Sequence, residues 1–317
     1  MELFISHQSA LEHWRKSRIL PVNCKDLRCI VKLPKTPSEI DSSVFSAFIL
    51  PIHVMIGSRD ARRDHNMIKQ HLYSNEIPIG CFMNVGGDLM ISSPEFCFLQ
   101  MANQLSLPSL MELGYEFCGV YSLPNTDESS IPERGFFNRM PVTNVKKLSA
   151  FLYNMSGFAG HKKAMRALRY IRDKSASPME TKLAMFLTLP YKLGGYGFSL
   201  FELNKRIVLS KSARKHFNKE YYICDMFWPE KRIAVEYDSD QQHTGSDRIA
   251  SDSIRRNALE SLGIKVVIVT KKQLYSSVEM EIVARVIAKH ANKRLFHTKN
   301  NFADERRELR KQLLGIY

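Results

Sequence analysis

Residues 221–243 read YYICDMFWPEKRIAVEYDSDQQH, and this stretch predicts a β-hairpin. Residues 221–227 are rich in aromatic and β-branched side chains, which favour a strand. Pro229 and the three polar residues after it fit a turn, and residues 233–238 fit the returning strand. We expect the second half of the chain to be organised around this hairpin.

The hairpin carries three carboxylates in a region that otherwise looks buried. Side chains alternate between the faces of a strand, so Glu236 and Asp238 share one face of the returning strand. Asp225 lies on the neighbouring strand. Burying a carboxylate is costly unless it is paired, protonated or bound to a metal, and oxygen ligands favour a hard cation. We therefore expect Asp225, Glu236 and Asp238 to hold Mg²⁺, for which Mn²⁺ can substitute.

The basic charge of the chain is unevenly divided. The 317 residues have room for two domains. Residues 1–160 contain 15 basic residues (Lys plus Arg) and 15 acidic residues (Asp plus Glu). Residues 161–317 contain 31 basic and 17 acidic residues. The half that carries the hairpin therefore holds the whole net charge of +14. A basic surface around an acidic pocket suits a polyanion such as DNA, although basic charge alone fits a solvated surface equally well.

Composition argues against several other classes of protein. The sequence contains no run of about 18 apolar residues, the length that would predict a membrane span. Its N-terminus turns polar too early for a secretory signal. The six cysteines are widely spaced and form no Cys-x-x-Cys pair, so we expect reduced thiols and no zinc site. The sequence thus predicts a cytoplasmic protein that does not contact a membrane.

Periodicity and helix-capping residues predict the remaining elements. The first half is expected to be an α+β domain over residues 1–160, with a helix that Ser92 opens, Glu95 standing at the capping-box spacing. It is also expected to contain loops over 58–72 and 123–143, a helix over 108–118, and helical structure over 144–172. The second half, residues 161–317, is expected to contain a helix from Ser177 to Gly194, a strand near 198–209, the hairpin, a helix over 246–262, a strand over 264–270, and helices over 276–292 and 301–314. This order favours an α/β fold in which a mixed sheet lies between helices.

Residue spacing across roughly 175–275 follows a known pattern. Glu180 lies on the early helix, Asp225 precedes an aromatic pair and a proline, and Glu236-x-Asp238 follows on the next strand. His243 stands five residues after Asp238. The helix that follows carries four residues on one face: Arg248, Asp252, Arg255 and Leu259. Gly263 then precedes the last strand. The second half therefore resembles the restriction-endonuclease-like nucleases, the PD-(D/E)XK superfamily. It is most similar to the branch of very-short-patch-repair endonucleases and related small endonuclease-domain proteins.

The resemblance implies a restriction-endonuclease-like mixed sheet flanked by helices, and metal-dependent hydrolysis of phosphodiester bonds. It implies that Asp225 and Glu236, with Asp238 or Glu180, hold one or two Mg²⁺ ions. His243 would assist proton transfer or the leaving group, and basic residues of the following helix would contact phosphate: Arg248, Arg255 and Arg256. Local alternatives remain open, because Glu180 also fits a capping box, His243 an ordinary loop, and the arginines a surface salt-bridge ladder.

The chain departs from the family pattern at two positions. Asp238 stands where the wider superfamily usually has a lysine, and Ser239 where it usually has a glycine. Which group activates the water is therefore open. In the first half, Ser93 to Gly119 resembles proteins related to the type IV abortive-infection antitoxins, a similarity that carries no chemistry.

The sequence as a whole predicts a Mg²⁺-dependent endodeoxyribonuclease of bacterial defence or repair, with double-stranded DNA as its partner and a protein partner for the first half. The alternatives are a non-catalytic DNA-binding regulator and an antitoxin-like protein built on a nuclease fold.

Overall fold

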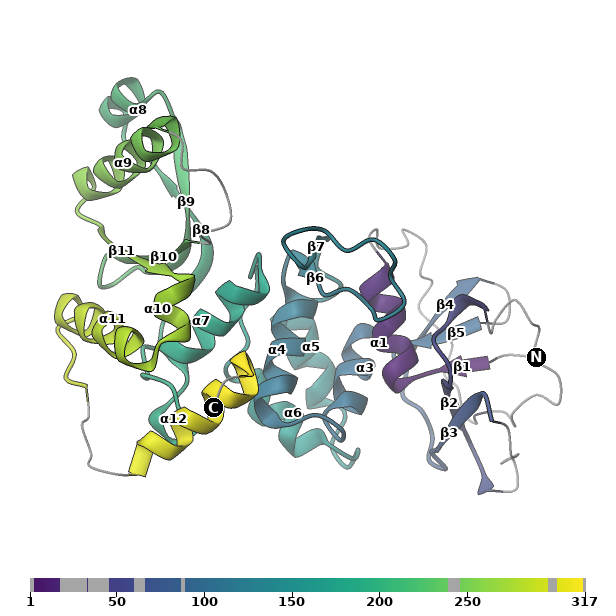
Figure 1. Cartoon of the computed structure of the whole chain (residues 1–317). Helices are drawn as coiled ribbons and strands as arrows, with labels where there is room; N and C mark the ends of the chain where they lie inside the picture. Colours follow the sequence, from purple (N-terminus) through teal and green to yellow (C-terminus); the bar gives the residue numbers. More distant parts are fainter. Residues whose placement is uncertain are drawn as a thin grey trace. The chain divides into compact units, whose positions relative to one another are not determined.

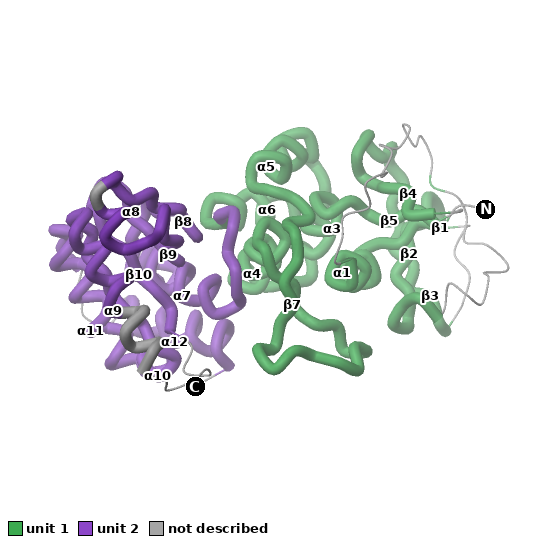
Figure 2. The backbone as a smooth tube through the Cα atoms, turned by 90° about the horizontal axis from the view of Figure 1, so that it is seen from above, with its two compact units in different colours: residues 1–171 green, residues 172–317 purple. Residues whose placement is uncertain are grey.

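The computed structural model describes residues 3–17, 33, 46–59, 66–86, 89–238, 246–295 and 301–315, without the side chains of Ser212, residues 246–252 and Asn301. The chain forms two compact units, Met1–Ile171 and Arg172–Tyr317 (Figure 2). Each unit has its own sheet and its own helices (Figure 1). Among the described residues, no helix is long and apolar enough to cross a bilayer.

The first unit contains a five-stranded mixed sheet with the strand order β3-β2-β1-β5-β4. Strand β1 is parallel to β5 and β2 is parallel to β3, whereas the pairs β1–β2 and β4–β5 are antiparallel. The strands are β1 Leu3–Ile5, β2 Ile52–Ile56, β3 Ile68–Leu72, β4 Phe82–Gly86 and β5 Leu89–Ser92. Every residue of β1 and β2 is buried, so the middle of the sheet belongs to the core.

Helices of the first unit begin at side chains that cap them. Ser93, Ser106 and Asn144 each accept a hydrogen bond from the backbone N–H three residues further on. A proline stands in the first turn after each of the two serines, where its missing N–H costs nothing. The helices are α1 His7–Lys16, α3 Pro94–Met101, α4 Leu107–Cys118, α5 Val145–Tyr153 and α6 His161–Leu168.

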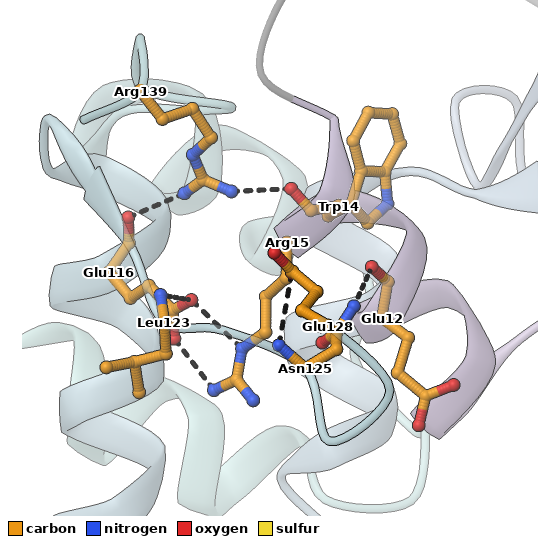
Figure 3. A network of polar contacts seen from close by, with 8 residues as sticks. All are labelled: Glu12, Trp14, Arg15, Glu116, Leu123, Asn125, Glu128 and Arg139. Carbon is orange, nitrogen blue, oxygen red and sulfur yellow. Dashed lines mark hydrogen bonds and ion pairs between the residues drawn. The ribbon is translucent and has the colours of Figure 1, made fainter. Parts of the chain in front are cut away.

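A buried polar network holds the loop between α4 and α5 (Figure 3). Arg15 donates from Nε and Nη2 to the two carboxylate oxygens of Glu116, at 3.0 and 2.9 Å. Arg139, in the loop, donates to the backbone carbonyls of Trp14 and Glu116, at 2.6 and 2.9 Å. Asn125 donates from Nδ2 to a carbonyl of α1 at 2.8 Å. The loop also contains the short strand β7 (Phe137–Asn138), paired with β6 (Tyr121–Ser122). It is ordered because it supplies partners for buried polar groups.

The second unit contains a four-stranded mixed sheet with the strand order β11-β10-β9-β8. Strands β8, β9 and β10 are successively antiparallel, and β11 is parallel to β10. Their bounds are β8 Glu202–Val208, β9 Tyr221–Trp228, β10 Ile233–Asp238 and β11 Lys265–Thr270. Helix α9 (Ser246–Ser261) provides the crossover that a parallel pair requires. The predicted α/β class and the mixed sheet are therefore confirmed.

Helices α8 and α9 cover one face of this sheet. Ala258 and Leu259 of α9 are buried in a cluster with Tyr222 of β9 and Ala234 of β10. Phe217 of α8 packs against the same cluster. The other helical segments of the unit are α7 Pro178–Thr188, η2 Tyr191–Leu193, α8 Lys211–Phe217, α10 Lys271–Tyr275, α11 Ser277–His290 and α12 Asn301–Leu314.

The hairpin and the predicted helices over 246–262 and 301–314 are confirmed, but other sequence predictions are corrected. Ser93 caps α3, because Ser92 still belongs to strand β5. The helix from Ser177 ends before Gly194, because Pro190 follows its last turn. Residues 58–72 include strand β3, residues 144–172 form two separate helices, and the short helices α8 and α10 were not predicted.

The boundary between the units lies after Ile171, not after residue 160. Helix α6 packs against α3, α4 and α5, so it belongs to the first unit. The hydroxyl of Tyr115 donates to the backbone carbonyl of Tyr170 at 2.7 Å. A Cβ built on Gly114 would overlap the side chain of Ile171, so α4 needs a glycine where Ile171 packs against it.

We predict that Gly114→Ala lowers the melting temperature, because overpacking at this contact costs about 1–3 kcal/mol. Ile171→Ala removes the atoms that the new Cβ would meet. The double variant should therefore be less destabilised than the two single variants added together. Thermal melts of the four proteins test this, and strict additivity would show that Gly114 does not meet Ile171.

Candidate active site

The two strands of the hairpin part at Asp225. Their described pairing ends at Val235 and Met226. The same register carried one residue further sets Glu236 opposite Asp225, at the short distance typical of cross-strand pairs. The backbone N–H of Tyr237 donates to Oδ2 of Asp225 at 2.8 Å. A carboxylate therefore lies in the gap between the two strands.

Glu236 is 9% exposed, and its two oxygens have different surroundings. Oε2 pairs with Nη2 of Arg255 at 2.7 Å, and the same nitrogen donates to the carbonyl of Ile223 at 2.5 Å. Oε1 is buried and makes no hydrogen bond of ordinary geometry among the described residues, although the backbone of Asp225 and the thiol of Cys224 lie close enough to lower the pKa of Glu236. A buried acceptor without a partner costs about 1–3 kcal/mol. A ligand that reached Oε1 would remove this cost.

Glu180 reaches the same region from the start of α7. Ser177 caps this helix by accepting a hydrogen bond from the N–H of Glu180 at 3.1 Å. The carboxylate of Glu180 bends back, and its Oε2 accepts from the N–H of Ala176 at 3.0 Å and from Nδ2 of Asn204 at 2.9 Å. Asn204 has a left-handed backbone conformation, with φ at 45°. Ser177 therefore caps α7 as predicted, but Glu180 accepts from Ala176 and not from the N–H of Ser177, so the reciprocal bond of a capping box is replaced by one to the preceding residue.

Burial raises the pKa values of all three carboxyl groups, and the charge of Asp225 adds to the shift of both glutamates. Burial, and then the charge of Asp225, raise the pKa of Glu236 to about 8, although Arg255 opposes the shift. Burial and Asp225 also raise the pKa of Glu180 to about 7. Burial raises the pKa of Asp225, against the hydrogen bond from Tyr237 and the charge of Arg255. Desolvation thus outweighs the one guanidinium, which leaves the cluster short of positive charge.

A cavity of about 190 Å³ opens beside these groups. Its polar lining comes from β9, β10 and α9, and its apolar lining from α9 and β11: Asp225, Glu236, Tyr237, Asp238, Arg255, Arg256, Leu259, Val266 and Ile268. This combination of an apolar wall, convergent polar groups and raised pKa values is typical of a functional pocket.

The structure brings two of the three predicted metal ligands together and leaves the third further along the cavity. Asp225 and Glu236 come together in the strand gap, and the half-buried Asp238 lines the cavity. However, among the residues that the structure describes, no three His, Cys, Asp or Glu side chains are grouped closely enough to hold a metal ion. Asp225, Glu236 and Asp238 thus do not form a three-ligand group in this structure, in which Glu236 pairs with Arg255.

The other predicted site residues fall into two groups. Arg255 and the exposed Arg256 line the cavity, and Arg255 pairs with a carboxylate. His243 lies outside the described residues, and for Arg248 the structure describes the backbone of α9 but not the side chain.

Two contacts of the site were missed by sequence reasoning: the Arg255–Glu236 ion pair and the Asn204–Glu180 hydrogen bond. The first had a usable signal. Arg255 stands four residues before the apolar Leu259, which places it on the helix face that packs against the sheet. The Asn204–Glu180 hydrogen bond had no sequence signal, because it depends on the left-handed backbone of Asn204 within strand β8.

A second group of titratable side chains lies in the first unit. The rings of His7 and His71 are stacked with their centroids 3.6 Å apart, and Nε2 of His71 is 3.1 Å from Nδ1 of His53. Burial lowers the pKa of His53 and of His71 to about 4 in each case. These rings pack as neutral groups within the first unit.

No family model, no curated protein and no solved structure matches this chain.

We predict that Glu236→Gln raises the melting temperature of the metal-free protein at pH 8. The folded-state pKa of about 8 lies above the ordinary value of 4.5, so the wild type loses stability as the pH rises through this range. Gln keeps an acceptor for Arg255 without the charge. The gain should be on the order of 1–3 kcal/mol at pH 8 and should vanish near pH 4.5.

Thermal melts in EDTA across this pH range measure the effect. Glu260→Gln, at an exposed position of α9, is the matched control and should change little. A lower melting temperature for Glu236→Gln at pH 8 would mean that the ionised pair with Arg255 stabilises the fold.

Proposed function

We propose that the second unit is a metal-dependent endonuclease that hydrolyses phosphodiester bonds in DNA. The proposal rests on one observation above all: Glu236 is buried beside Asp225 with Oε1 lacking a partner. Carboxylates that are buried, close together and incompletely paired are the groups that gain most from a cation. Mg²⁺ prefers oxygen ligands and keeps several waters, so Asp225 and Glu236 fit it as a pair.

When bound, Mg²⁺ supplies a Lewis acid and a water of lowered pKa. The protein groups around it would divide the remaining work. The pKa of Glu180, about 7, lets this carboxyl group exchange a proton near neutral pH. Arg255 would release Glu236 and turn its guanidinium toward a phosphate, and Arg256 would contact the backbone from the rim of the cavity. By resemblance, His243 and Arg248 would assist from α9 and the segment before it.

One observation favours a non-catalytic DNA-binding regulator instead. The Arg255–Glu236 ion pair occupies Oε2 of Glu236 and partly offsets its charge. In a protein that only binds DNA this pair would persist, because no ligand would compete with Arg255 for Glu236.

Cleavage of supercoiled plasmid in Mg²⁺ or Mn²⁺ tests the proposal. We expect nicking by the wild type, none in EDTA, and a loss of at least about a hundredfold in Asp225→Asn and in Glu236→Gln, because each variant removes a ligand carboxylate. Glu260→Gln should nick at the rate of the wild type.

Retained cleavage in Glu236→Gln would reject this site. A wild type that binds DNA but cleaves no DNA or RNA would favour the binding-only regulator.

A further inference from the structure

A strongly basic segment precedes β9, and the proposed chemistry does not use it. Residues 203–219 contain six Lys and Arg and no Asp or Glu. The segment comprises most of β8, helix α8 and the residues that lead into β9. We call residues 203–219 the basic arm.

The arm is anchored on one side and exposed on the other. Ala213 and Phe217, one helical turn apart, pack against the cluster beneath α8 and α9. Ser210 caps the start of α8, and Asn218, with φ at 48°, ends it. Five cations of the arm are exposed: Arg206, Lys211, Arg214, Lys215 and Lys219. The helix therefore presents a fixed basic stripe.

Aromatic rings orient two of these cations without neutralising them. The guanidinium of Arg206 lies 3.8 Å from the ring centroid of Tyr221, and the ammonium of Lys219 lies 5.7 Å from that of Tyr222. A ring face holds a cation and leaves its full charge available to an anion. Lys205 differs, because it pairs with Glu202 at 2.7 Å.

The arm lies on the same face of the sheet as the candidate active site. Helix α8 packs against α9, and the two lie side by side at one end of the unit (Figure 1). Leu259 of α9 belongs both to the cluster under α8 and to the cavity beside Glu236. Strand β9 starts at the arm and reaches Asp225 four residues later, about 13 Å away at 3.3 Å per residue. On a duplex this spans about four base pairs.

We propose that the basic arm binds backbone phosphates of duplex DNA a few base pairs from the bond placed at Asp225 and Glu236. The inference rests on the proposed function for its substrate, but it concerns binding and not cleavage. Lys211, Lys215 and Lys219 would neutralise phosphates, and each neutralised phosphate releases counterions.

The test compares two triple variants of the full-length protein in EDTA, where no cleavage occurs. In one, Lys211, Lys215 and Lys219 become Gln. In the other, three exposed lysines away from the arm become Gln: Lys231, Lys265 and Lys289. Both variants lose the same net charge. Anisotropy titrations of a labelled 20-base-pair duplex are repeated between 50 and 200 mM salt.

We expect the arm variant to bind roughly tenfold to a hundredfold more weakly at 100 mM salt. Its log–log salt slope should fall by about 2–3, while the control triple stays close to the wild type. Equal losses in the two triples, or an unchanged slope, would overturn the proposal, as would stronger arm-dependent binding of duplex RNA than of DNA. If DNA binding depends on the arm but no plasmid is nicked, only the nuclease proposal is rejected. If plasmid is nicked but the arm variant leaves the salt slope unchanged, only the proposal for the arm is rejected.

Discussion

The buried carboxyl group of Glu236 lies beside the half-buried one of Asp225 where strands β9 and β10 part, and one guanidinium faces them. This imbalance of charge is the constraint on which the candidate site depends. Burial raises the pKa values of both Asp225 and Glu236, and Arg255 only partly offsets it. Ionised carboxylates that close together repel one another unless a cation lies between them. A fold that keeps such a pair gives up stability, and in our proposal it does so in order to bind a cation.

The other elements of the second unit position the side chains around the place where β9 and β10 separate. The antiparallel pairing of β9 and β10 sets Glu236 opposite Asp225, and the parallel pairing of β10 with β11 requires the crossover helix α9. Because α9 packs on the sheet through Ala258 and Leu259, it delivers Arg255 to Glu236. The cap that starts α7 then brings Glu180 into electrostatic contact with Asp225. Short-range rules thus bring Asp225 and Glu236 together and place Glu180 within reach of the charge of Asp225.

The hairpin and its paired carboxylates could be predicted because strand alternation and register act locally. The spacing of Arg255 and Leu259 indicated which face of α9 meets the sheet, but the choice of Glu236 as the partner of Arg255 depends on how α9 packs there. Helix α8 was not predicted, because only Ala213 and Phe217 anchor so short a segment. The cap of α3 was placed one residue too early, because the spacing to Glu95 favoured Ser92 over Ser93. The unit boundary lies later than predicted because α6 packs against α3, α4 and α5, an arrangement that no local pattern encodes.

A crystal structure of the protein soaked in Mn²⁺, with the anomalous signal of the metal recorded, tests the central claim most directly. The account predicts a Mn²⁺ ion bound by one oxygen from Asp225 and one from Glu236, with Arg255 released from Glu236. A strand gap without Mn²⁺, with the Arg255–Glu236 ion pair intact at Mn²⁺ concentrations well above those used for plasmid nicking, would contradict it.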